Sequence, residues 1–169
     1  MLCTRRLARI LRLARPLLAA ICATVALGAC SSDPNPDKPA AKGALDVNSG
    51  ECLFVTEGLA AQVADLPVID CTKPHTHEIF ATVIDKTDQV FPGMATLEQL
   101  AETRCYGEFE GYVGISPFDS SLFVTWIVPS LGSWNDKDDR SILCVLGPSK
   151  GGQLTASVKG MKRGSWRSS

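Results

Sequence analysis

The chain lacks the short motifs that mark the common catalytic folds. It contains no Gly-x-Ser-x-Gly nucleophile elbow and no glycine loop of the phosphate-binding kind. Histidine is scarce, with two among 169 residues, and no motif singles out a catalytic pair among the eighteen acidic residues. These absences favour a protein that is not an enzyme.

Positive charge is missing beyond the N-terminus. The formal net charge is −1, but five of the seventeen basic residues lie within the first fifteen positions: Arg5, Arg6, Arg9, Arg12 and Arg15. Residues 30–169 hold 12 basic and 18 acidic side chains, a net charge of −6. Nucleic-acid binding requires a basic surface that offsets phosphate charge, so we expect no nucleic-acid partner.

No apolar run in the N-terminal region is long enough to span a membrane as a helix. Residues 17–27 form an apolar stretch of about 11 residues, whereas a spanning helix needs about 20. With the arginines before it, this stretch predicts a signal peptide over residues 1–29, exported by the Sec pathway. The Arg5-Arg6 pair leaves twin-arginine export as an alternative.

The signal peptide ends in Leu27-Gly28-Ala29-Cys30, which resembles the lipobox of bacterial lipoproteins. In that motif the cysteine becomes the new N-terminus and its thiol carries diacylglycerol, including palmitate. We therefore expect lipidation at Cys30 and a lipid-anchored protein on the extracytoplasmic face of the cell membrane, since two acyl chains anchor stably. An uncleaved anchor and an ordinary signal peptide are the alternatives.

Composition divides the rest of the chain into three parts. Residues 31–43 (SSDPNPDKPAAKG) are rich in proline and charge, so residues 30–44 are expected to be the lipidated cysteine and a flexible tether. Residues 45–159 should form one folded domain. Residues 160–169 contain Lys162, Arg163 and Arg167 among glycines and serines, which predicts a basic disordered tail.

Four cysteines remain in the predicted domain: Cys52, Cys71, Cys105 and Cys144. An even number in an exported chain predicts two disulfides. Spacing alone permits three pairings, of which we favour Cys52–Cys71 with Cys105–Cys144. A zinc site is the alternative, although the domain has no C-x-x-C pair.

The pattern of apolar residues predicts an α+β fold, with one main helix packed on a mostly antiparallel sheet. β-branched and aromatic runs predict strands at residues 51–55, 67–70, 77–84, 122–128, 142–146 and 154–158. Thr96 and Gln99 form a Thr-x-x-Gln capping box before a helix over 97–105 that extends toward 110. Cys105 should face the sheet near Cys144.

The run from Pro74 to Glu78 contains both histidines, His75 and His77. In an extended chain these two imidazoles project on the same side and could bind a metal, while Glu78 would point away. This pair supports an alternative function in metal or small-ligand binding. In the competing interpretation, one imidazole packs near Cys71 and donates to a backbone carbonyl, the other is solvated, and no cofactor is needed.

Residues 135–140 (NDKDDR) form an acidic cluster after Trp134. The cluster lacks the glycine and the distal glutamate of an EF-hand loop, which disfavours calcium binding. We expect a polar turn in which Arg140 pairs with neighbouring carboxylates while Trp134 covers the edge of the core.

The order of these features resembles the septum-formation domain family of actinobacterial envelope proteins over residues 50–160. The motifs that carry the resemblance are Gly50-x-Cys52-Leu53, Asp70-Cys71-x-x-Pro74-His75-x-x-Glu78-x-Phe80-Ala81, Phe91-Pro92-Gly93, Cys105, Trp134 and Asp139-Arg140-x-x-x-Cys144. The resemblance implies an exported or membrane-attached domain with two structural disulfides and no established active site. The family's name links such domains to septum formation. Because the predicted domain is anchored and tethered and has no catalytic constellation, we expect it to bind an envelope or division protein.

Overall fold

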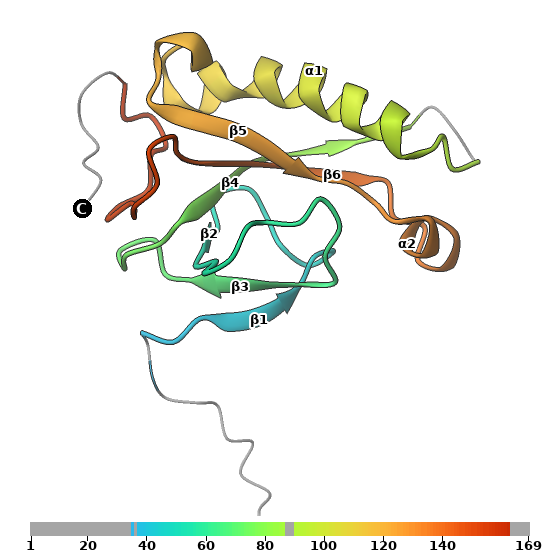
Figure 1. Ribbon diagram of the computed structural model, residues 1–169, viewed down its shortest axis with the longest axis horizontal. Coiled ribbons are helices and arrows are strands. Elements are labelled where there is room, and N and C mark those ends of the chain that lie inside the picture. The colour runs from blue at the N-terminus through green and yellow to red at the C-terminus, as the bar shows by residue number, and fades with distance from the viewer. Residues whose placement is uncertain (1–34, 36, 87–89, 163–169) are drawn as a thin grey trace, which may run out of the picture. The chain divides into compact units, whose positions relative to one another are not determined.

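A computed structural model describes residue 35 and residues 37–86 and 90–162 of the chain (Figure 1). The predicted signal peptide, the lipidation site at Cys30, residues 31–34 and 36 of the tether and the tail from Arg163 onward lie outside the described residues.

Six strands form one antiparallel sheet in the order β1-β3-β2-β4-β6-β5. The strands are β1 (Ala40–Gly43), β2 (Cys52–Leu53), β3 (Asp65–Ile69), β4 (His77–Ile84), β5 (Leu122–Ile127) and β6 (Ser141–Pro148). The helices are α1 (Met94–Val113), the short 3₁₀ helix η1 (Pro117–Asp119) and α2 (Leu131–Asp136). The predicted α+β class with one main helix is confirmed.

The core has two layers, one on each face of the central strands. Helix α1 covers one face of β4, β5 and β6, and strands β1, β2 and β3 lie on the other side (Figure 1). β6 serves both layers, because its successive side chains alternate between the two faces. Cys144 and Leu146 pack with α1, whereas Leu143 and Val145 pack with Leu53 of β2. This double burial explains the nearly continuous apolar run of β6.

Helix α1 is longer than predicted and begins differently. Its N-cap is Gly93, which has a φ of 89° and makes no side-chain cap hydrogen bond. The predicted capping box is therefore wrong, because Thr96 already lies in the first helical turn. The helix ends at Gly114, whose left-handed φ of 90° and N–H bond to the Glu110 carbonyl form the C-cap.

The sheet begins earlier and ends earlier than the sequence predicts. β1 lies within the expected tether and pairs with Asp65–Val68 of β3. An edge strand pairs through backbone groups, so its sequence need not be apolar. The strand predicted at 154–158 is a single bridge between Leu154 and His75. Leu154 and Val158 are buried although they lie in a loop, which explains why the apolar pattern of this segment resembled that of a strand.

Both favoured disulfides are present. Cys52 is bonded to Cys71 with their Cα atoms 5.2 Å apart, and Cys105 is bonded to Cys144 with their Cα atoms 5.3 Å apart. The first joins β2 to the turn after β3, and the second joins α1 to β6. The zinc alternative for these four cysteines therefore does not describe this structure.

We expect two glycine-to-alanine substitutions to change stability in opposite directions. A Cβ at Gly147 in β6 would lie 2.9 Å from the Thr76 carbonyl oxygen and 2.9 Å from the Phe123 ring. Overpacking should make Gly147→Ala destabilising by about 1–3 kcal/mol. Gly107 lies in α1 with nothing within 4 Å of its added Cβ, so Gly107→Ala should stabilise by about 0.5–1 kcal/mol. Urea denaturation measures the free energy of unfolding of both variants. Equal changes in the two variants would contradict the packing described for β6.

Candidate functional site

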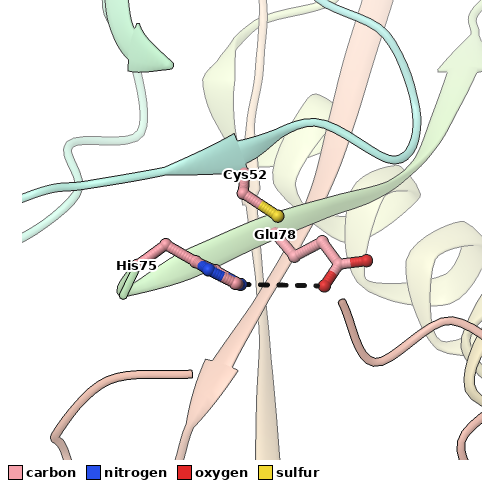
Figure 2. A group of neighbouring side chains, drawn as sticks. All are labelled: Cys52, His75 and Glu78. Carbon is pink, nitrogen blue, oxygen red and sulfur yellow. Dashed lines mark ion pairs between the residues drawn. The ribbon is translucent and has the colours of Figure 1, made fainter. Parts of the chain in front are cut away.

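Cys52, Glu78 and His75 converge between β2, β4 and the loop before β4 (Figure 2). The antiparallel register places Cys52 opposite Glu78. His75 is fixed by a backbone bridge, in which its N–H donates to the Leu154 carbonyl at 2.9 Å and its carbonyl accepts from the Leu154 N–H at 2.7 Å. The site is therefore assembled from three segments that are held by backbone hydrogen bonds.

Strand alternation predicted that Glu78 points away from His75, but in the structure the two side chains lie next to each other. Nε2 of His75 lies 4.0 Å from Oε2 of Glu78, and both side chains are fully buried. The prediction was wrong because regular alternation does not extend back to His75, since β4 begins at His77.

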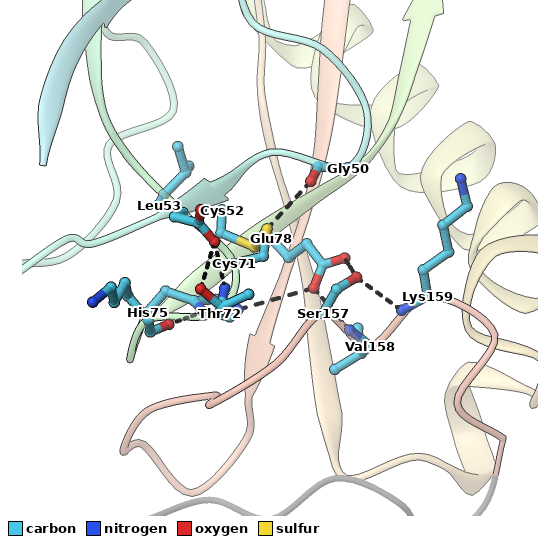
Figure 3. Close-up of a disulfide and its surroundings, with 12 residues drawn as sticks. Gly50, Cys52, Leu53, Cys71, Thr72, His75, Glu78, Ser157, Val158 and Lys159 are labelled. Carbon is cyan, nitrogen blue, oxygen red and sulfur yellow. Dashed lines mark hydrogen bonds and ion pairs between the residues drawn. A yellow bond between two sulfur atoms is a disulfide. The ribbon is translucent and has the colours of Figure 1, made fainter. Parts of the chain in front are cut away.

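The Glu78 carboxylate accepts three hydrogen bonds, and Figure 3 shows two of the donor residues, Ser157 and Val158. Oε1 accepts from the hydroxyls of Tyr112 and Ser157, the latter at 2.6 Å, and Oε2 accepts from the N–H of Val158 at 2.9 Å. A buried carboxylate requires such donors, because burial without them is costly. Glu78 thereby joins β4, α1 and the C-terminal loop.

The pKa of Tyr112 is raised well above its usual value of 10.0, chiefly by burial and then by the hydrogen bond to Glu78. In the unfolded chain a tyrosine loses its proton near pH 10, whereas folded Tyr112 keeps it. Above that pH the unfolded state binds fewer protons than the folded state, so the free energy of unfolding falls as the pH rises.

We therefore expect Tyr112→Phe to flatten the loss of stability above about pH 10. At neutral pH the same variant should lose about 1.5–3 kcal/mol, the contribution of a hydrogen bond to a charged group. Denaturant titrations from pH 7 to 11 measure both effects. Tyr106→Phe, which alters a ring on the outer face of α1, is the matched control. If the free energy of unfolding fell equally steeply with pH in the two variants, the raised pKa assigned to Tyr112 would be contradicted.

His75 has one satisfied and one unsatisfied ring nitrogen. Nδ1 lies 2.8 Å from the carbonyl oxygen of Lys73, and since a carbonyl only accepts, Nδ1 carries a proton. This agrees with the interpretation in which one imidazole donates to a backbone carbonyl. Nε2 is buried and has no hydrogen-bond partner among the residues that the structure describes.

His77 has a different environment from His75. Its Nδ1 lies 2.9 Å from the Thr76 hydroxyl oxygen, and its ring packs edge-on against Phe123 with centroids 5.7 Å apart. Burial lowers the pKa of His77, and the nearby His75 lowers it further.

The predicted pairing of His75 with His77 around a metal is not what the structure assembles. Within the described part of the chain, the group with suitable spacing is Cys52, His75 and Glu78, whose ligand atoms all lie within 4.8 Å of one another. Cys52 is disulfide-bonded here, so its sulfur is not a thiolate.

The other motif residues have structural contacts. Trp134 is buried in α2, and Arg140 lies 3.8 Å above its ring while donating to its carbonyl at 2.9 Å. Arg140 also pairs with Asp138 at 3.0 Å, as predicted for this turn, and Asp139 accepts from the Ser141 N–H at 2.9 Å. Pro74 is exposed. Helix α2 itself was not predicted; its signal is the capping box between Ser130 and Ser133.

A groove beside α2 is separate from the buried polar group. It has a volume of about 340 Å³, with Ile127, Val128 and Leu143 among its apolar lining residues and Asp136 and Lys137 among the polar ones. A second recess of about 380 Å³ lies beside the Cys52–Cys71 disulfide, with Gly50 and Ile69 also among its lining residues.

The family model for septum formation matches residues 49–167. The chain belongs to the septum-formation family. The match covers the described domain from just before β2 to the C-terminal loop, and it confirms the resemblance seen in the sequence. Comparison with curated proteins and with solved structures finds no match. Among the described helices, none combines the length and the apolar character needed to cross a membrane.

The residues that hold Glu78 were missed by the sequence analysis. The sequence analysis did not connect Tyr112 or Ser157 with Glu78, and it placed Ser157 in a predicted strand. The available signal was Glu78 itself, an acidic residue inside the apolar run of β4, because a buried acid requires donors from elsewhere in the fold.

Proposed function

We propose that this protein is a lipid-anchored extracytoplasmic lipoprotein whose septum-formation domain binds an envelope or division protein without catalysing a reaction. The Cys30 lipobox supports the membrane-lipid anchor, and family membership supports the association with the envelope and septum.

The proposal that the domain catalyses no reaction rests on the burial of its acid–base residues, His75, Glu78 and Tyr112. His75 and Glu78 are both 0% exposed, and Tyr112 is 8% exposed. The carboxylate is already occupied by three donors from its own fold. General acid–base catalysis needs a group within hydrogen-bond reach of the substrate, and this group is enclosed by protein.

The anchor would keep the domain close to the membrane. Nine residues separate Cys30 from β1, and their covalent length is at most about 30 Å. A partner would therefore be found among proteins at the membrane surface or in the adjoining wall layer.

Metabolic labelling with an alkyne fatty acid, followed by fractionation, tests the anchor. We expect label on the wild-type chain and its recovery with the membrane, and we expect Cys30→Ser to lose the label and leave the membrane fraction. Cys22→Ser, which changes a cysteine inside the signal peptide, is the control and should behave like the wild type. Unlabelled wild-type protein, or a labelled Cys30→Ser variant, would contradict the proposal.

Assays of the purified protein with wall polymers and membrane lipids test the absence of catalysis. We expect no turnover. Hydrolysis that a single side-chain substitution abolishes would contradict the proposal.

A further inference from the structure

The buried nitrogen of His75 is oriented as a metal ligand would be. Histidines that bind metals usually donate their other ring N–H to a carbonyl or carboxylate, which fixes the tautomer and the direction of the ring. Here Nδ1 donates to the Lys73 carbonyl at 2.8 Å, and Nε2 has no partner in the described structure although it is fully buried. In the neutral ring, Nε2 therefore carries an unused lone pair.

Glu78 supplies a fixed oxygen next to that nitrogen. Its Oε2 lies 4.0 Å from Nε2 of His75 (Figure 3). The carboxylate is held by Tyr112, Ser157 and Val158. For bonds of about 2.0–2.3 Å, two ligand atoms of a tetrahedral zinc ion lie about 3.5 Å apart. The observed separation is close to this value, so small side-chain movements would bring both atoms to one ion.

The remaining donors are the sulfurs of the neighbouring disulfide. Sγ of Cys52 lies within 4.8 Å of the His75 and Glu78 ligand atoms (Figure 2), and Cys71 is bonded to it. A disulfide offers no thiolate, but two free cysteines would complete a set of two sulfurs, one nitrogen and one oxygen. Cys105–Cys144 belongs to no comparable group within the described residues.

We propose that reduction of Cys52–Cys71 creates a zinc site formed by Cys52, Cys71, His75 and Glu78. The site goes beyond the proposed function and does not depend on the anchor. Thiolate and imidazole ligands in a tetrahedral set suit Zn²⁺, and the donors behind His75 and Glu78 act as the outer shell that such sites require. Zinc binding would then depend on the thiol redox state of the surroundings.

The reaction balances with a dithiol as reductant. One thiolate of the dithiol attacks the half-buried Cys71 sulfur, breaks the Cys52–Cys71 bond and forms a mixed disulfide. The second thiol of the reductant resolves this intermediate, so the reductant leaves as a disulfide and the protein holds two thiols. Zn²⁺ then replaces their two protons, which are released to solvent, and no further electrons are transferred.

Zinc protection of individual cysteines tests the proposal directly. The full-length chain carrying Cys3→Ser, Cys22→Ser and Cys30→Ser is treated with limiting phosphine without oxygen, so that the partly exposed Cys52–Cys71 bond is reduced while the fully buried Cys105–Cys144 bond is kept. The sample is incubated with or without zinc, alkylated and mapped by mass spectrometry. We expect about one zinc per reduced chain and almost none per oxidised chain. Zinc should slow alkylation of Cys52 and Cys71, while Cys105 and Cys144, which are still disulfide-bonded, should stay unalkylated with or without zinc.

His75→Ala removes a ligand and should weaken zinc binding by more than the roughly 10–100-fold that the loss of an outer-shell partner costs. His77→Ala, the matched control, should leave zinc binding unchanged. Equal alkylation of Cys52 and Cys71 with and without zinc would overturn the proposal. So would retention of full affinity in a folded His75→Ala variant. If His75→Ala does not fold, zinc protection of Cys52 and Cys71 in the chain that keeps His75 decides the outcome alone.

Discussion

Removal of the Cys105–Cys144 disulfide is expected to be the most damaging change to the domain. Both sulfurs belong to fully buried residues in the core between α1 and β6. The cross-link spans 39 residues, which corresponds to about 4 kcal/mol in the chain-entropy model. Since small domains are stable by only about 5–15 kcal/mol, Cys105→Ala/Cys144→Ala should abolish folding at growth temperature.

Each single variant, Cys105→Ala or Cys144→Ala, should lose the same cross-link and leave an unpaired thiol in the core. Circular dichroism and thermal melting of the three variants measure the loss. Phe118→Ala is a control in which a large ring that is 88% exposed is removed, and we expect an effect within about 0.5 kcal/mol. A double variant that accumulates and melts like the parent would contradict this account of the core.

Truncation of Glu78 is expected to have the second largest effect. Glu78→Ala removes the acceptor from the hydroxyls of Tyr112 and Ser157 and from the N–H of Val158. Breaking a buried charged network by removing one member costs about 3–5 kcal/mol. The loss should appear first in the C-terminal loop, because two of the three donors lie there and hold it against β4.

Hydrogen exchange resolved by segment, together with urea denaturation, measures this effect. We expect faster exchange across residues 154–162 in Glu78→Ala and a smaller change in Glu78→Gln, which preserves size and one acceptor. Glu51→Ala is the matched control, since it removes a partly exposed carboxylate paired with Lys42 at 2.7 Å and should cost at most about 1 kcal/mol. Equal losses in Glu78→Ala and Glu51→Ala would show that the network does not hold the loop.

Local patterns in the sequence predicted much of the fold. The run at 77–84 is β4, and the apolar run at 142–146 lies inside β6. Both strands are long and lie in the centre of the sheet. Because their side chains are largely buried, their sequences are visibly apolar, and this made the strands predictable. The favoured disulfide pairs are also those of the structure.

Elements without an apolar pattern, such as β1 and α2, could not be predicted from the sequence in the same way. β1 is an exposed edge strand in a segment rich in proline and charge, and its pairing with β3 leaves no apolar pattern. Helix α2 has six residues, which is too short for a periodic signal, although its serine cap was present in the sequence.

The polar group around Glu78 could not be predicted because its members are far apart along the chain. Tyr112 lies 34 positions from Glu78, Ser157 lies 79 and Val158 lies 80. Their convergence requires the packing of α1 and of the C-terminal loop against β4. The sequence located His75 as a chemically interesting residue and paired it with His77, whereas the group of potential metal ligands in the described residues joins His75 to Glu78 and Cys52.

The most direct test of the proposed function is crosslinking in the native envelope, followed by mass spectrometry of the captured proteins, with Cys30→Ser as the matched control. The account predicts reproducible enrichment of division or wall-synthesis proteins with the wild-type chain, and loss of that enrichment when the anchor is removed. The absence of any reproducible partner, or an identical set of partners with Cys30→Ser, would contradict the account of a membrane-anchored binding domain.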